Sequence, residues 1–256
     1  MRTFVFDKSN FFMKTNTQFK NEALAALKGN WGKAVLATLV YALLVGLAVG
    51  PSTWQTIETQ AYVQEHVSGS SVYAAASLIQ DPAYQLLQKK QTGTSAFTFL
   101  IEVFLIFPLL VGFANAFRVL LVKADNDILP NTFKIGFSNY WHKVLGMLHM
   151  VILIGLWSLL FLIPGIIKGF SYAMTPFILE ENPELGTQQA IHRSRMMMRG
   201  HKFDLFWLYL SFIGWGILCI FTFGIGYFWL APYMETAQAA FYEEVKADYA
   251  INGGLD

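Results

Sequence analysis

The apolar residues of this chain are gathered into long blocks, each about the length of helix that crosses a bilayer core. Hydrophobic residues make up 55% of the 256 residues and charged residues only 14%, against roughly 25% charge in average soluble domains. Much of the chain is therefore solvated by something other than water. The net charge of +1 gives no field that would draw the chain to nucleic acid. The blocks predict an all-α fold, a polytopic bundle of membrane helices.

Uninterrupted apolar runs predict five membrane spans. These are residues 31–50, 97–122, 144–163, 205–221 and 224–240. The Thr222–Gly226 segment between the last two is short enough to predict a tight hairpin. The first span follows a largely polar leader that is too long for a cleavable signal peptide, so we expect an uncleaved first helix.

The run IPGIIKGFSYAMTP, residues 163–176, decides the topology, because a Pro-Gly pair interrupts an apolar stretch there. The element that follows, residues 165–179, is short for a crossing, and an interfacial or re-entrant helix is the alternative. If it crosses, 15 of the 18 Lys and Arg residues fall on one side of the membrane. If it does not, the cluster at 193–202 falls outside, against the positive-inside rule. The count favours six helices, both termini in the cytoplasm and a break at Pro164-Gly165.

Three segments complete the predicted single membrane domain over residues 1–256. Residues 1–30 form a cytoplasmic amphipathic leader, whose helix over 10–30 lies in the headgroup layer or extends the first span. Residues 51–96 form an extracytoplasmic loop with a short helix at 82–90, which Asp81 caps and a proline begins. Residues 97–245 form the core helix bundle.

Motifs of soluble enzymes are missing from the sequence. It contains no Walker loop, dinucleotide glycine fingerprint or Gly-x-Ser-x-Gly elbow. His142 and His149 share a helix face, but no nearby carboxylate completes a metal site. The single cysteine, Cys219, lies in an apolar block and indicates a buried thiol. We therefore expect no enzyme activity, no metal and no cofactor.

Polar residues follow one face of the predicted 165–179 helix: Lys168, Ser171, Tyr172 and Thr175. Beside this stripe, Gly165, Gly169 and Ala173 form a ridge of small residues that predicts close approach of another helix. A polar stripe is costly against lipid, so it faces other helices or a wet cavity. Structural hydrogen bonding and a ligand-lining face are the two interpretations.

Further ionisable and polar residues lie within or beside the spans. Glu102 and Lys168 fall at similar depth, and they snorkel separately to the surface, form an ion pair or line an ion pathway. Glu235, Gln238 and Tyr242 make a second stripe at the cytoplasmic end of the last span. A basic rim follows the fourth element: Arg193, Arg195, Arg199 and Lys202. This rim binds anionic lipid headgroups, pairs with the acidic residues before it, or is a solvated charge run.

Several short pieces carry a resemblance to a known family. They are Pro164-Gly165-Ile166-Ile167-Lys168, Asn182-Pro183, Gly200-His201-Lys202, Phe212-Ile213-Gly214-Trp215 and Pro232-Tyr233, with ALAALKGNWGKAV near the N-terminus. Outside residues 51–96 the chain resembles the bacterial membrane proteins of domain-of-unknown-function family 975. The resemblance implies a multi-pass protein of the bacterial cytoplasmic (inner) membrane, distantly similar to membrane domains of glycerophosphodiester phosphodiesterases. It implies no activity, substrate or catalytic residue.

Two functions are consistent with these features. The first is a non-enzymatic protein that binds membrane lipids, a membrane protein partner or a second copy of itself, in envelope maintenance or in immunity to a membrane-active peptide. The alternative is a small transporter or channel, with a polar path lined by Glu102, Lys168, Tyr172 and Glu235.

Overall fold

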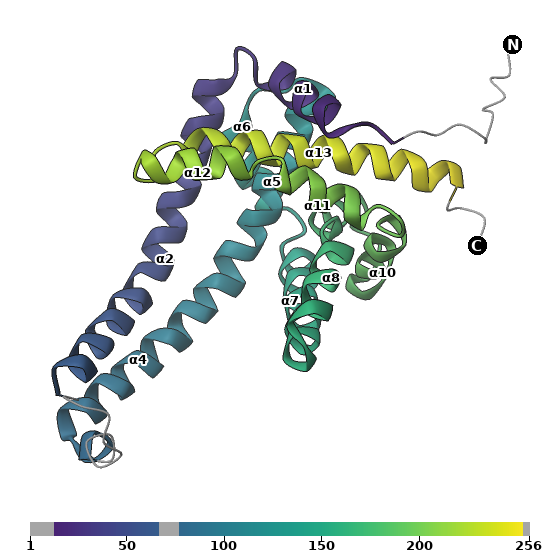
Figure 1. Ribbon diagram of the computed structural model, residues 1–256. Helices are drawn as coiled ribbons and strands as arrows, with labels where there is room; N and C mark the ends of the chain where they lie inside the picture. The colour runs from purple at the N-terminus through teal and green to yellow at the C-terminus, as the bar shows by residue number, and fades with distance from the viewer. Residues whose placement is uncertain (1–12, 67–76, 253–256) are drawn as a thin grey trace, which may run out of the picture. The chain divides into compact units, whose positions relative to one another are not determined.

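The computed structural model describes residues 13–66 and 77–252, and the secondary structure in these ranges is helical throughout. Five helices there are long and apolar enough to cross a membrane. The predicted all-helical class is therefore confirmed. The helices (Figure 1) are α1 (Asn16–Leu27), α2 (Trp31–His66), α4 (Pro82–Ile101), η1 (Glu102–Ile106), α5 (Phe107–Lys123), α6 (Ile128–Phe137), α7 (Tyr140–Leu160), α8 (Leu162–Tyr172), α9 (Thr175–Glu181), α10 (Thr187–Met197), α11 (Lys202–Leu210), α12 (Ile213–Phe221) and α13 (Tyr227–Asn252).

The chain divides into two compact units. The first comprises the described parts of Met1–Leu39 and Phe107–Asp256, and the second comprises the described parts of Val40–Ile106. In the second unit α2 and α4 replace most of the loop predicted over residues 51–96. The helix predicted at 82–90 begins where expected, but it continues through the end of α4. The loop prediction is wrong because the Gln, Ala, Glu and Leu residues of these segments are good helix formers without an apolar pattern.

The predicted N-cap of α4 is confirmed. The Asp81 carboxylate accepts a hydrogen bond from the Ala83 amide at 2.8 Å, which satisfies one of the free donors at the helix start. The other carboxylate oxygen accepts a hydrogen bond from the Tyr62 hydroxyl at 2.6 Å. The cap thus also ties the end of α2 to the start of α4 within this unit.

In the first unit α5 packs against α6, α7, α9 and α13. Gly112 of α5 faces α6 so closely that an added Cβ would lie 2.0 Å from the Thr132 carbonyl oxygen and 2.7 Å from the Gly136 amide nitrogen. Only glycine fits at this position, so the α5–α6 contact depends on it.

The amphipathic leader helix is confirmed as α1. Its buried residues are Phe19, Ala23 and Leu27. They pack on α13, where the Phe19 and Phe241 rings lie 5.4 Å apart. A turn with Gly29 at φ +81° separates α1 from α2, so the suggestion that the leader extends the first span is wrong. Residues 10–12 of the predicted helix lie outside the described residues.

The break predicted at Pro164-Gly165 lies before these residues, at Phe161. This residue has extended backbone angles, φ −158° and ψ 143°, between α7 and α8. Pro164 falls in the first turn of α8, where a missing amide proton costs nothing, so it does not end a helix. The helix predicted at 165–179 is divided, because the chain turns after Tyr172 and resumes as α9. The two parts together, Leu162–Glu181, make up one of the five candidate spans.

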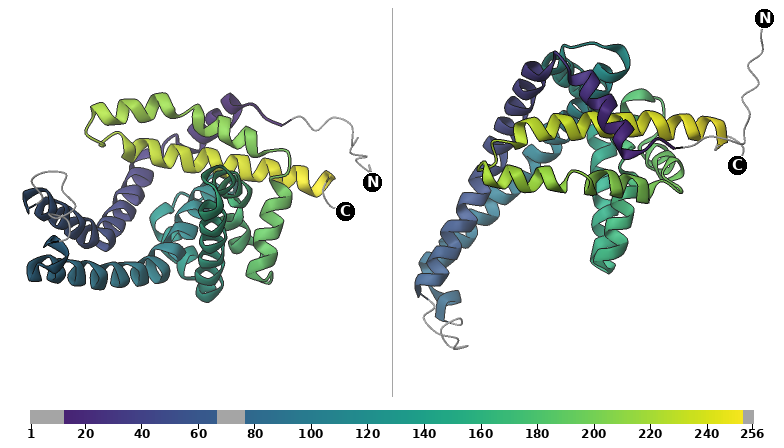
Figure 2. Two further views of the ribbon diagram at one scale, coloured as in Figure 1. Left: turned by 60° about the horizontal axis from the view of Figure 1, so that its bottom comes forward. Right: turned by 45° about the horizontal axis from the view of Figure 1, so that its top comes forward.

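The last predicted hairpin is present, with changed boundaries. Figures 1 and 2 show α11 and α12 running beside α13. The predicted 205–221 span is divided at Ser211 into α11 and α12. Gly224, at φ +84°, lies in the predicted tight turn. The neighbouring Phe223 is 97% exposed, at the tip of this turn. α13 extends well beyond the predicted residue 240 and is not among the five helices that are long and apolar enough to be candidate spans.

Candidate functional site

A charge cluster joins three helices of the first unit. The Arg118 guanidinium of α5 lies 2.5 Å from one Glu181 oxygen and 3.0 Å from Glu243. The Lys246 ammonium lies 2.6 Å from the same Glu181 oxygen. The Tyr242 hydroxyl donates to the other Glu181 oxygen at 2.5 Å. Two cations and one phenol therefore surround the carboxylate at the end of α9, which fixes α9 between α5 and α13.

An asparagine supports the same junction from α5. The Asn115 side chain is fully buried and donates to the Pro176 carbonyl of α9 at 2.9 Å. Its oxygen accepts from the Arg118 Nε at 3.1 Å. This network orients the guanidinium and satisfies a backbone acceptor where α9 begins. The charge cluster is thus built as a structural connection.

A second ion pair lies at the start of α7. The fully buried Lys143 ammonium lies 2.6 Å from Glu180 of α9. It also donates to the Ser138 carbonyl at 2.8 Å and to the Ile135 carbonyl. For the sequence, Lys143 was only one of the 15 Lys and Arg residues counted on the cytoplasmic side. Its burial could not be inferred, because the partners come from a turn and from a distant helix.

The polar stripe of the fourth element is divided between separate contacts. The Lys168 ammonium lies 4.4 Å from the centre of the Trp157 ring, a cation–π arrangement. The Ser171 hydroxyl donates to the Ile167 carbonyl one turn back at 2.8 Å. The Ser171 carbonyl accepts from the Ser194 hydroxyl of α10 at 3.0 Å. Two of the four stripe residues are therefore held by structural contacts.

The other predicted polar residues lie in several places. Tyr172 and Thr175 are buried in the first unit, and the Thr175 hydroxyl has no hydrogen-bond partner among the described residues. Glu235 and Gln238 are half-buried on α13. Glu102 is exposed and belongs to the other unit, so a Glu102–Lys168 pair stays a prediction. In the described ranges no three His, Cys, Asp or Glu residues lie close enough to hold a metal ion.

The ridge of small residues allows close helix packing at one position, Gly165. A Cβ added to Gly165 would lie 2.1 Å from the Ser158 hydroxyl oxygen, so α8 and α7 approach closely there. Nothing lies within 4 Å of a Cβ added to Gly169. The predicted close approach of another helix is confirmed at the first glycine and not at the second.

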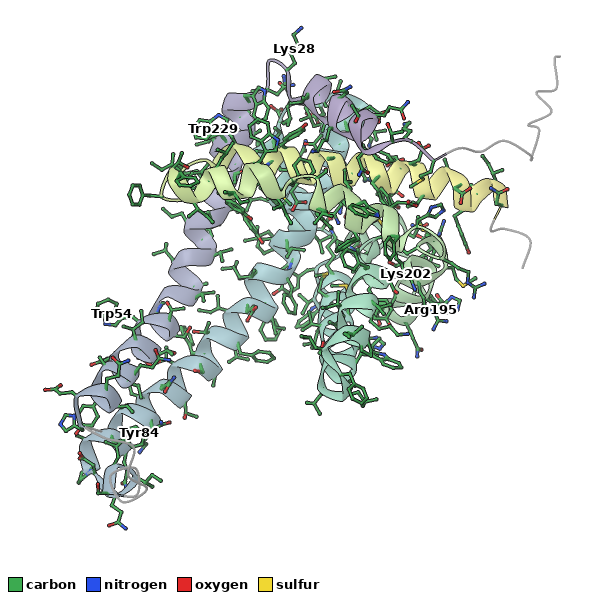
Figure 3. The ribbon with its side chains drawn as sticks, viewed as in Figure 1. Lys28, Trp54, Tyr84, Arg195, Lys202 and Trp229 are labelled. Atoms are coloured by element: carbon green, nitrogen blue, oxygen red, sulfur yellow. The ribbon has the colours of Figure 1, made fainter. Side chains whose placement is uncertain are left out.

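The basic rim makes no ion pair with the acidic residues that precede it, within the part of the chain described. Arg193 donates to the Asn182 side chain at 2.9 Å, whereas Arg195 and Arg199 are exposed and Lys202 is half-buried. Figure 3 shows Arg195 and Lys202 on the same region, at α10 and the start of α11. The rim therefore has cations available for headgroups.

An apolar groove of about 480 Å³ runs between α1, the start of α2, α12 and α13. Its lining is almost entirely apolar and includes Leu24, Trp31, Trp215, Leu218, Trp229 and Tyr233. Cys219 also lines it, and the same thiol lines a second apolar groove of about 650 Å³ between α11–α12 and α13. Sequence analysis missed these grooves, because their residues come from segments far apart in the chain.

The fold defines a helical protein with several membrane-length apolar helices, and this points to a membrane protein. Residues 147–249, from α7 through most of α13, match a family model described as "Protein of unknown function (DUF975)". The match supports the family resemblance for this part of the chain. No curated protein and no solved structure matches the chain.

Proposed function

We propose that this chain is a non-enzymatic, multi-pass protein of the bacterial cytoplasmic membrane that binds lipid or a partner protein. Its role would lie in envelope maintenance or in immunity to a membrane-active peptide. The observation that carries the proposal is the apolar groove between α1, α2, α12 and α13. A concave apolar surface of this kind suits an acyl chain or an apolar segment of another protein.

The charged groups support the same proposal. The ion pairs of Arg118, Lys143 and Lys246 connect helices of the first unit. The basic rim and the groove offer the surfaces that suit a lipid headgroup and an apolar chain. Binding, with no chemical step, is the activity that these surfaces favour.

The proposed topology has both termini in the cytoplasm and six crossings, with α13 as the sixth. It rests on the 15 of 18 Lys and Arg residues that this arrangement places inside. The turn before α13 is then external. A Phe223→Cys, Cys219→Ser variant in intact cells should react with a membrane-impermeant maleimide. Reaction only after permeabilisation would contradict the sixth crossing.

Purification tests the proposed activity directly. The protein is extracted in mild detergent, its bound lipids are quantified, and a parallel sample is crosslinked in the membrane before extraction. The proposal predicts retained lipid in molar proportion to protein, or one specific crosslinked partner. If neither is found, the binding function is wrong.

A transporter or channel is the second candidate. The observation in its favour is the buried Thr175 hydroxyl, which has no partner among the described residues and lies in the same stripe as Tyr172. The path would also include Glu102, Lys168 and Glu235. Flux through proteoliposomes should then fall in Glu102→Ala and Lys168→Ala variants. Flux equal to that of empty liposomes would exclude this candidate.

A further inference from the structure

A cation, Lys20, lies close to the apolar groove without lining it. Lys20 lies one turn before Leu24 on the same face of α1, and Leu24 lines the groove. The Lys20 ammonium also lies 4.3 Å from the centre of the Phe212 ring. That ring packs edge-on against Tyr233, another lining residue, with centroids 5.0 Å apart. The ammonium therefore lies near two of the lining residues, Leu24 and Tyr233.

This lysine has donors to spare. Its ammonium donates to the Ser211 carbonyl at 2.7 Å, and a lysine carries three donors. No carboxylate in the described ranges lies within ion-pair distance of it. Burial lowers the pKa of Lys20, as expected where a cation loses water without gaining an acid. An anion at this position would replace the missing partner.

The groove is long enough for part of an acyl chain. On α12 its lining runs from Trp215 to Thr222, and seven residues of helix rise about 10 Å. This is about a third of the roughly 30 Å hydrocarbon core of a bilayer. Trp31, Trp215 and Trp229 stand along its walls, and Figure 3 shows Trp229 on α13 beside α12.

We propose that this groove holds one acyl chain of an anionic phospholipid, with its phosphate bound by Lys20. The proposal rests on the proposed lipid-binding function and specifies its ligand and its site. The acyl chain runs from Lys20 along α12 and α13 towards the turn before α13.

The single cysteine of the sequence reports occupancy, because Cys219 lines the groove. The rate at which N-ethylmaleimide alkylates Cys219 is measured on the full-length protein in detergent, with added phosphatidylglycerol or phosphatidylcholine. At ten times its dissociation constant, phosphatidylglycerol should slow alkylation about tenfold, because only the unoccupied protein reacts. Phosphatidylcholine should need about ten times more lipid, because its headgroup has no net charge for Lys20 to neutralise.

Two variants and a control make the test specific. Lys20→Gln should remove the preference for phosphatidylglycerol. The matched control Lys28→Gln removes the same charge from the α1–α2 turn (Figure 3), outside this groove, and should keep the preference. Leu24→Trp fills this groove and should abolish protection of Cys219 by either lipid. A lipid bound in the second groove that Cys219 also lines would still protect the thiol in this variant.

The results of these experiments distinguish a failure of the proposed lipid site from a failure of the proposed binding function. Equal protection of Lys20→Gln and the unaltered protein, or protection that survives Leu24→Trp, would overturn the site even if lipid co-purifies. No protection of the unaltered protein by any lipid would also overturn it. Absence of both co-purified lipid and a crosslinked partner would overturn the binding function as well.

Discussion

Replacing Arg118 with leucine tests whether the charge cluster holds α5, α9 and α13 together. The Arg118 side chain is 11% exposed and that of Glu181 is 17% exposed, so the pair is largely shielded from water. Removing one partner of a buried ion pair costs about 3–5 kcal/mol. Glu181 keeps its contacts to Lys246 and Tyr242, so we expect the lower end, about 3 kcal/mol. For a protein of this size that lowers Tm by about 6–12 °C.

The assay is the fraction of protein that stays monodisperse after heating in detergent. Lys123→Leu is the matched control, since Lys123 ends the same helix, is exposed and should change stability by less than about 0.5 kcal/mol. The double variant Arg118→Leu, Glu181→Gln should lose less stability than the two single variants together, because it leaves no unpaired carboxylate at Glu181. An Arg118→Leu protein as stable as Lys123→Leu would refute the structural role of the cluster.

Three further predictions concern the first unit. Gly112→Ala should lower the free energy of unfolding by about 1–3 kcal/mol, because its Cβ would collide with the Thr132 carbonyl. The control Gly155→Ala, whose Cβ would have nothing within 4 Å, should be neutral or stabilising in the same heating assay. Lys143→Met should lower Tm, because it leaves the Glu180 carboxylate unpaired. Adding Glu180→Gln should recover part of the lost Tm. No recovery would refute the stabilising ion pair between Lys143 and Glu180. Hydrogen bonds from the Asn131 side chain and the Asp127 amide hold the pKa of Asp125 below its usual 3.8. The stability that this carboxylate contributes is therefore present above that value and lost as pH falls through the lower folded pKa. Asp125→Asn should flatten the Tm profile in this acid range, and an unchanged profile would contradict the role of these hydrogen bonds.

The sequence predicted the helical class because its apolar blocks have the length of membrane spans. It also located local signals correctly, such as the Asp81 cap and the tight turn at Gly224, because these depend on adjacent residues. The prediction was wrong where we took a proline as the end of a helix. Pro164 lies inside the first turn of α8, and Pro51 lies within α2.

The candidate sites were harder to predict, because they combine distant segments. Glu181 meets Arg118 and Lys246 only after α5, α9 and α13 have packed. The groove likewise forms only when α1 folds back against α13. The glycine at position 29 predicts a turn there, but it does not predict in which direction α1 runs after the turn. Periodicity indicates which face of a helix is apolar, but it does not indicate which helix covers that face.

Native mass spectrometry of the purified full-length protein tests the central claim most directly. The binding account predicts one retained phospholipid per chain, of anionic type, in the unaltered protein and in Lys28→Gln. In Lys20→Gln it predicts a retained phospholipid with no preference for the anionic type. A protein that carries no lipid under the mildest conditions that keep it folded, and that has no crosslinked partner in the membrane, would contradict the account.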